Sequence, residues 1–236
     1  MTSTPLTTSF KVLAFDADDT LWDCQGHFEQ VMQHLYDELL PWVDRQTATA
    51  ELFATERKNM PMLGFGVKAF TLSMLETAMR VSRQQIPAST LQTILQQCYA
   101  LLSFPTTPLP GVAETLLRLR DEGRWRMVVF TKGELQDQEN KLRRSGLMHL
   151  FDDVEITSDK TQHEFLQLCE HQQIHPSQLL MVGNSLKSDI APALAIGAWA
   201  VHIPFHVTWE LEHTDTFEHP RLTSITHFDE LLPLLL

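Results

Sequence analysis

Three carboxylates stand within four positions in the segment Asp16-Ala-Asp-Asp-Thr20. The segment directly follows a short apolar run, Phe10–Phe15, which is typical of a buried strand. Carboxylates at the carboxyl end of a parallel strand lie where open α/β sheets place their binding sites. Because such crowding of like charges is unfavourable unless a cation or a reaction partner uses it, the segment is a candidate site. An Asp-rich turn or helix cap would give the same local pattern.

Three further polar segments each follow a later strand-like run. Thr131-Lys132-Gly133 offers a hydroxyl and backbone N–H groups that could bind phosphate oxygens at the start of a helix. Lys160 could neutralise a phosphate and a carboxylate together, although a solvated lysine is the ordinary alternative. Asp189 follows a tight turn that begins at Gly183. Since each segment follows a strand, we expect all of them at the same edge of one sheet.

The second half of the chain predicts the architecture that positions these segments. Strand-like runs alternate there with helical patterns, which indicates right-handed crossovers and a parallel sheet covered on both faces. Helices are predicted over Leu135–Ser145 and Thr161–Gln172, and the terminal Leu-rich segment is predicted to dock as a helix. The predicted strands are Phe10–Phe15, Met127–Phe130, Val154–Thr157, Leu179–Val182 and Trp199–Ile203.

About ninety residues between the first strand and Pro110 have helical periodicity and no strand-like run. Apolar spacing predicts three helices there, near residues 28–40, 70–81 and 91–102, and the segment around Pro61 and Gly64 marks a break between helices. We therefore predict an α/β catalytic core formed by residues 1–21 and 107–236, interrupted by a helical cap of residues 22–106.

Composition excludes several classes of function. The 236 residues include 18 Lys and Arg against 30 Asp and Glu, a net charge of −12, which disfavours binding to nucleic acid or to anionic membranes. Three cysteines without paired spacing indicate neither a disulfide framework nor a zinc ribbon. The chain shows no signal peptide and no apolar run long enough to cross a bilayer, so we expect a cytoplasmic protein.

The four polar segments together resemble the ordered signatures of the haloacid dehalogenase superfamily. These signatures are D-x-D-x-T, a Thr or Ser after the second strand, a later Lys and an acidic pair, and the resemblance covers the whole predicted core. It implies a Rossmann-like parallel sheet of strand order 5-4-1-2-3. It also implies that the helical insert after the first motif acts as a cap over the site.

The resemblance assigns roles to individual residues. Asp16 is implied as the nucleophile that becomes an aspartyl phosphate, and Asp18 as the acid/base that protonates the leaving oxygen and later deprotonates water. The implied phosphate-binding groups are Thr131, Lys160 and the backbone at Lys132 and Gly133.

A magnesium ion is implied as the cofactor, because the site offers hard oxygen ligands. The implied ligands are Asp16, the backbone carbonyl of Asp18, and Asp189. The common family pattern has Asp after Gly183, whereas this chain has Asn184, which brings no charge. We expect Asn184 to lie next to the metal and to bind it directly or through water.

The predicted function is hydrolysis of a small phosphorylated metabolite by a Mg²⁺-dependent phosphatase, acting as a monomer or homodimer. An acid at position 18 argues against the dehalogenase branch, whose leaving halide needs no proton. The alternatives are a phosphomutase with the same nucleophile and a catalytically weakened regulatory or binding protein, for which Asn184 is the only sequence support. Lys68, Phe65 and Trp22 are candidate substrate contacts in the cap, although aromatic residues with helical spacing commonly belong to a core.

Overall fold

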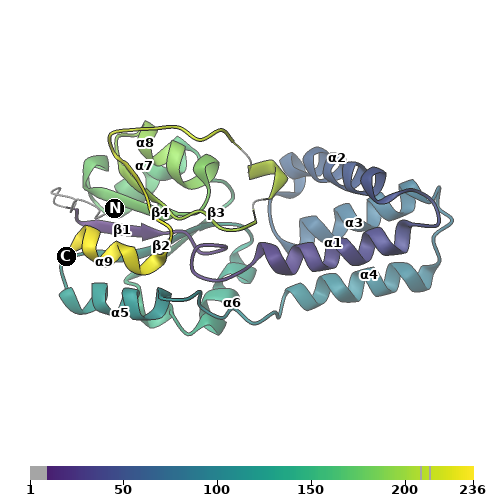
Figure 1. Cartoon of the computed structure of the whole chain (residues 1–236), viewed down its shortest axis with the longest axis horizontal. Coiled ribbons are helices and arrows are strands. Elements are labelled where there is room, and N and C mark those ends of the chain that lie inside the picture. Colours follow the sequence, from purple (N-terminus) through teal and green to yellow (C-terminus); the bar gives the residue numbers. More distant parts are fainter. Residues whose placement is uncertain (1–9, 208, 213) are drawn as a thin grey trace. The chain divides into compact units, whose positions relative to one another are not determined.

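The computed structural model describes residues 10–207, 209–212 and 214–236. The chain divides into two compact units, the first formed by Met1–Asp23 with Thr106–Leu236 and the second by Cys24–Pro105. Figure 1 shows a sheet with flanking helices in the first unit and the helices α1 to α4 in the second. The assignment of catalytic and cap roles to these units stays a prediction.

The first unit contains a six-stranded sheet whose neighbouring strands all run parallel. Its order is β3-β2-β1-β4-β5-β6, so the predicted order 5-4-1-2-3 is confirmed and one edge strand is added. The strands are β1 (Val12–Phe15), β2 (Arg126–Lys132), β3 (Asp153–Thr157), β4 (Leu179–Gly183), β5 (Trp199–His202) and β6 (Leu222–Ser224).

Alternate residues of β1 are buried against opposite layers. Val12 and Ala14 belong to the same cluster as Phe165 of α7, while the ring of Phe15 contacts that of Phe228. Figure 1 shows α7 and α8 on one side of the sheet and α5 and α9 on the other. Because both faces are covered, β1 is apolar throughout. The helices of this unit are α5 (Val112–Glu122), α6 (Leu135–Ser145), α7 (Gln162–His171), α8 (Ala191–Ala195) and α9 (Leu231–Leu235).

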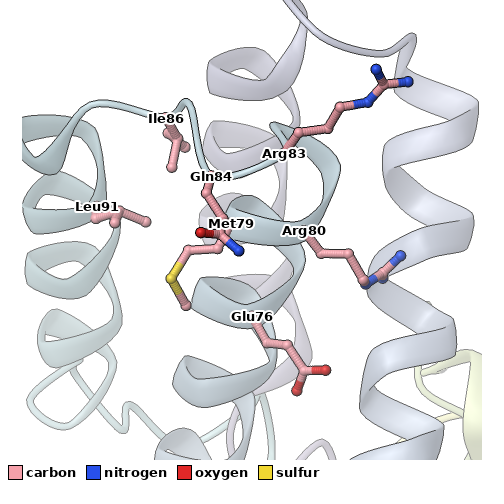
Figure 2. A pocket seen from close by; sticks show the side chains of 7 residues that line it. All are labelled: Glu76, Met79, Arg80, Arg83, Gln84, Ile86 and Leu91. Carbon is pink, nitrogen blue, oxygen red and sulfur yellow. The ribbon is translucent and has the colours of Figure 1, made fainter.

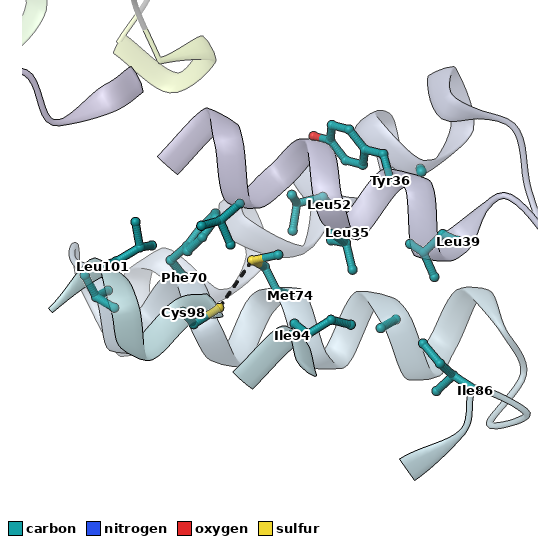
Figure 3. Close-up of a cluster of buried hydrophobic side chains, with 14 residues drawn as sticks. Leu35, Tyr36, Leu39, Leu52, Phe70, Met74, Ile86, Ile94, Cys98 and Leu101 are labelled. Atoms are coloured by element: carbon teal, nitrogen blue, oxygen red, sulfur yellow. Dashed lines mark hydrogen bonds between the residues drawn. The ribbon is translucent and has the colours of Figure 1, made fainter. Parts of the chain in front are cut away.

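The second unit has its own core between four helices, of which Figure 3 shows the buried side chains. Fully or almost fully buried residues such as Leu35, Met74 and Ile94 come from different helices, and the Cys98 thiol donates to the Met74 sulfur over 3.6 Å. The helices are α1 (Gln25–Leu39), α2 (Arg45–Leu63), α3 (Val67–Val81) and α4 (Ala88–Leu101).

Helix α2 is not among the three helices predicted for this segment, because its buried face is half polar. The buried residues Ala48, Leu52, Thr55 and Asn59 have helical spacing, but only two of them are apolar. The polar pair is satisfied by α3, since the Thr77 hydroxyl donates to Thr55 over 2.9 Å and the Asn59 amide donates to Glu76 over 3.0 Å. Hydrophobic periodicity alone cannot reveal such a helix.

The edge strand β6 is likewise absent from the predicted elements. It has three residues, of which Thr223 and Ser224 are polar, and it joins the sheet through its pairing with β5.

A separate finding concerns membranes: among the described residues, no helix combines the length and the apolar character that a membrane span requires.

Candidate active site

Asp16, Lys160 and Asp189 meet at the carboxyl end of the central strands. Asp16 directly follows β1, Lys160 lies between β3 and α7, and Asp189 lies in a single π-helical turn, Leu186–Ile190. The Lys160 Nζ lies 2.5 Å from Oδ1 of Asp16 and 2.7 Å from Oδ1 of Asp189. All three side chains are buried, and a buried ammonium between two carboxylates is a strong, hydrogen-bonded ion pair.

The charges of this cluster do not balance. Burial and the Asp189 carboxylate raise the pKa of Asp16 to about 7, against the lowering effect of Lys160. Burial lowers the pKa of Lys160, but its two carboxylate partners outweigh this effect and raise the pKa overall. Lys160 therefore stays an ammonium, and two carboxylates share its single positive charge. An additional cation would be favourable at this place.

Gly183, the last residue of β4, makes room for Asp189. A Cβ atom added to Gly183 would lie 2.3 Å from Oδ2 of Asp189, a distance that real Cβ contacts do not reach. The same Oδ2 accepts a hydrogen bond from the backbone N–H of Ser185 over 2.9 Å. The glycine at the end of β4 thus allows the carboxylate of the following turn to fold back against the strand.

Thr20 connects the first and the last motif. Its hydroxyl lies 3.0 Å from Oδ2 of Asp16 and 3.1 Å from Oδ1 of Asn184, and it accepts from the Asn184 backbone N–H over 3.1 Å. The backbone carbonyl of Asn184 in turn contacts Nε2 of His202 at 3.0 Å. The side-chain oxygen of Asn184 therefore faces Thr20, beside Asp16, and its place next to a metal stays a prediction.

Asp18 has a separate set of partners. Its Oδ1 accepts from the indole N–H of Trp22 over 2.8 Å, and its Oδ2 accepts from the Gln138 amide over 2.8 Å and from the Lys141 ammonium over 2.6 Å. Burial raises the pKa of Asp18, but Lys141 and these hydrogen bonds lower it overall. The pKa of Asp18 is therefore lowered, whereas that of Asp16 is raised.

Sequence reasoning missed Lys141 and Gln138, which come from the buried face of α6. The buried residues of this helix include Asp137, Gln138, Lys141 and Ser145, so the face directed at the interior is mostly polar. Polar residues recurring at helical spacing in the helix after the second strand were the available signal. Polar side chains on a helix are ordinarily assigned to solvent, and only packing shows which face is buried.

The second motif is arranged differently from the prediction at Gly133. Thr131 is buried near the end of β2, and its phosphate-binding role stays a prediction. The Gly133 N–H, however, donates to the Thr157 carbonyl over 2.9 Å, so this N–H does not serve the predicted phosphate cradle. The cause is the parallel pairing of β2 with β3, which extends to Lys132.

The Lys132 side chain points to a different group of partners, which the sequence pattern did not predict. It forms an ion pair with Glu212 and donates to the Ser188 hydroxyl over 2.7 Å. Glu212 also accepts from Ser188 over 2.6 Å and from Ser185 over 2.5 Å. These four residues join the end of β2, the π-helical turn and the segment Glu210–Glu212.

The three predicted substrate contacts lie in different units. Trp22 belongs to the first unit, and its indole N–H donates to Asp18. Because Trp22 is completely buried, it has no exposed surface for a substrate. Phe65 and Lys68 belong to the second unit, where Lys68 is exposed, and both stay predicted contacts. The hollow in Figure 2, of about 530 Å³, also lies in the second unit, and none of the predicted site residues lines it.

The residues present fit a magnesium ion. Asp16 and Asp189 provide two carboxylates with one ammonium between them, and Asn184 provides a neutral oxygen nearby. In the part of the chain that the structure describes, no group of three or more His, Cys, Asp or Glu side chains is arranged to hold a metal. A site with two carboxylates and neutral oxygens suits Mg²⁺, which keeps several waters and uses few protein carboxylates.

Known proteins share both the sequence pattern and the fold. The family model of haloacid dehalogenase-like hydrolases matches residues 10–197. Among curated proteins, glyceraldehyde 3-phosphate phosphatase of Methanothermobacter thermautotrophicus is 26% identical over 208 residues, which cover 84% of this chain and 87% of that protein.

Two solved structures extend the comparison. A haloacid dehalogenase-like family hydrolase from Xanthomonas campestris superposes with a TM-score of 0.82 at 31% identity, covering 94% of this chain and 90% of that one. The 2-haloacid dehalogenase of Pseudomonas syringae pv. Tomato has a TM-score of 0.65 at 20% identity, covering 95% and 97%. The fold alone therefore does not select the reaction. The family match and the Xanthomonas relative show that this chain belongs to the haloacid dehalogenase-like hydrolases.

Proposed function

We propose that this protein is a Mg²⁺-dependent phosphatase that hydrolyses a small phosphorylated metabolite through an aspartyl phosphate on Asp16. The observation that carries the proposal is the presence of two separately held carboxylates after β1, Asp16 on Lys160 and Asp18 on Lys141. Hydrolysis of a phosphate ester needs a nucleophile and a distinct acid/base, whereas a leaving halide needs no proton. The similarity to a phosphatase supports the same choice.

The first step uses both carboxylates. An oxygen of Asp16 attacks phosphorus while the bond between phosphorus and the leaving oxygen breaks, and Asp18 donates a proton to that oxygen. Because the resting pKa of Asp18 is lowered, Asp18 must first take up a proton when the substrate binds. The negative charge of the phosphoryl group favours this uptake.

The second step regenerates the enzyme. Asp18 removes a proton from a water molecule whose oxygen attacks phosphorus, and the bond between phosphorus and Asp16 breaks to release phosphate. Lys160 and the Thr131 hydroxyl are the groups proposed to bind the phosphoryl oxygens. When bound, Mg²⁺ would neutralise charge on these oxygens, and its proposed ligands are Asp16, Asp189, the Asp18 carbonyl and Asn184.

The test is phosphate release from p-nitrophenyl phosphate and from a panel of sugar, nucleotide and triose phosphates, with Mg²⁺ or EDTA. Asp16→Asn is the critical variant, and Asp121→Asn on the exposed face of α5 is the matched control. We expect release that requires Mg²⁺, disappears in Asp16→Asn and persists in the control. Formation of an isomeric sugar phosphate without free phosphate would instead identify a phosphomutase. Absence of turnover in folded wild-type protein would contradict the proposal and favour a binding protein.

A further inference from the structure

The two oxygens of Asp18 have unequal surroundings. Oδ2 accepts two hydrogen bonds, from the Gln138 amide at 2.8 Å and from the Lys141 ammonium at 2.6 Å. Oδ1 accepts one, from the indole of Trp22 at 2.8 Å. A carboxylate oxygen has two lone pairs, so the donors on Oδ2 fill its accepting capacity, whereas Oδ1 keeps one lone pair.

The donors on Oδ2 are themselves held in place. The Gln138 amide also donates to the Lys132 carbonyl over 3.0 Å, which occupies its second N–H and fixes its plane. Lys141 is 2% exposed, its ammonium lies 3.6 Å from Oδ2 of Asp137, and its backbone carbonyl accepts from the Thr106 hydroxyl over 2.9 Å. Both groups that hold Asp18 therefore make further contacts of their own.

A buried face with so many polar side chains does not favour the stability of the fold, if α6 only has to pack against its neighbours. Replacing a buried ion pair with apolar side chains is often neutral or stabilising, because desolvation of the charges offsets their attraction. Two buried oxygens of the same helix, Oδ1 of Asp137 and Oε1 of Gln138, have no hydrogen-bond partner among the described residues. A polar interior face with unsatisfied atoms points to a requirement other than stability.

We propose that Lys141 and Gln138 are positioning residues that fix Oδ2 of Asp18 and so reserve Oδ1 for proton transfer, an inference that rests on the proposed phosphatase function. In the first step the proton on Oδ1 passes to the leaving oxygen as its bond to phosphorus breaks. In the second step Oδ1 takes a proton from water as the water oxygen bonds to phosphorus and the bond to Asp16 breaks. Lys141 keeps its own proton throughout.

The inference makes a specific kinetic prediction for Lys141→Met. A poor leaving group such as an alkoxide depends on the proton from Asp18, whereas p-nitrophenolate leaves readily without one. We expect kcat to fall about 10- to 100-fold on the alkyl phosphate that the wild type hydrolyses best and much less on p-nitrophenyl phosphate, with KM nearly unchanged. Because Lys141 acts through Asp18, Lys141→Met should cause no further loss in an Asp18→Asn background.

Gln138→Leu provides a second test that removes no charge, should Lys141→Met fail to fold. It should produce the same dependence on the leaving group, with a smaller loss. Lys11→Met is the matched control, since Lys11 is an exposed lysine just before β1, and it should behave as the wild type on both substrates.

Two outcomes would overturn the inference while the proposed function stands. One is an equal loss on both substrates, which indicates a structural role, and the other is an additive loss in the Asp18→Asn background. The proposed function fails in a different way, through absent turnover in the wild type or turnover that survives Asp16→Asn. In that case the positioning role proposed for Lys141 and Gln138 is wrong as well.

Discussion

Asp16 and Asp189 share a single ammonium group, that of Lys160, although the two carboxylates belong to segments far apart in the sequence. Neither carboxylate is therefore neutralised by a cation of its own. Burial and the neighbouring Asp189 carboxylate raise the pKa of Asp16 to about 7, because the one ammonium of Lys160 only partly offsets them, while both carboxylates keep the pKa of Lys160 raised. The excess of negative charge favours an additional cation at this place, and several measurable consequences follow from the same geometry.

Asp16→Asn should abolish turnover and stabilise the fold. Loss of the proposed nucleophile should reduce kcat by at least about 10³-fold, as removal of a nucleophile does in other hydrolases. Without divalent cations, removing one of the crowded carboxylates should raise the unfolding temperature by about 3 °C or more, because Lys160 keeps Asp189 as its partner. Thermal unfolding in EDTA tests the second effect, and a lower unfolding temperature would contradict the account of crowded charge.

Gly183→Ala should damage both the fold and the site. The added methyl group would displace the Asp189 carboxylate, which should cost about 1–3 kcal/mol and most of the activity. Gly123→Ala is the matched control, because open space surrounds Gly123 and only its backbone φ of 61° is strained. The control should lose about 1–2 kcal/mol and no activity. Denaturant unfolding and phosphate release distinguish the two variants, and full activity of Gly183→Ala would refute the close-approach argument.

Asp152→Asn should weaken the dependence of stability on acid pH. Burial raises the pKa of Asp152, but hydrogen bonds from Arg120 and from the Met127 N–H lower it overall. A folded-state pKa below the unfolded value stabilises the fold above the unfolded pKa, and this contribution is lost as the pH falls through the folded value. The difference in unfolding free energy between wild type and variant should thus shrink as the pH falls below the ordinary carboxyl pKa of 3.8. Asp121→Asn serves as the control, and a difference that does not vary with pH would exclude this account.

Asn184→Asp should strengthen the binding of Mg²⁺. The side-chain oxygen of Asn184 lies 3.1 Å from the Thr20 hydroxyl, beside Asp16, so the substitution adds a negative charge next to the proposed ligands. Titration calorimetry should show tighter binding, and the pKa of the neighbouring Asp16 should rise further when Mg²⁺ is absent. If neither affinity nor activity increases, Asn184 gives no support to the idea of a weakened enzyme.

Glu212→Gln should loosen the π-helical turn that carries Asp189. Glu212 accepts from Ser185 and Ser188 and pairs with Lys132, so loss of its charge weakens all three contacts. Hydrogen exchange should become faster at the backbone amides of residues 186–190. The same measurement on Glu218→Gln, an exposed position, should match the wild type, and unchanged exchange in Glu212→Gln would show that the turn is held by other contacts.

Local patterns in the sequence were sufficient to predict the central sheet and the main residues of the candidate site. Runs such as Val12–Phe15 are buried on both faces, and burial of this kind leaves an uninterrupted apolar pattern that any reader of the sequence can detect. The polar residues that follow each run lie at one edge, because parallel strands all end there. Asp16, Lys160 and Asp189 were therefore predictable as neighbours, and the structure places them within hydrogen-bond distance.

Tertiary structure alone decided which polar side chains are interior. Thr55 and Asn59 of α2, and Gln138 and Lys141 of α6, are buried with polar partners that come from distant segments. A polar residue has the same appearance in the sequence whether water or a carboxylate solvates it. The order of residues along the chain determined which strands form and where their ends carry chemistry. Packing between separate elements determined that Gln138 and Lys141 are partners of Asp18, since these contacts exist only once α6 lies beside the segment that follows β1.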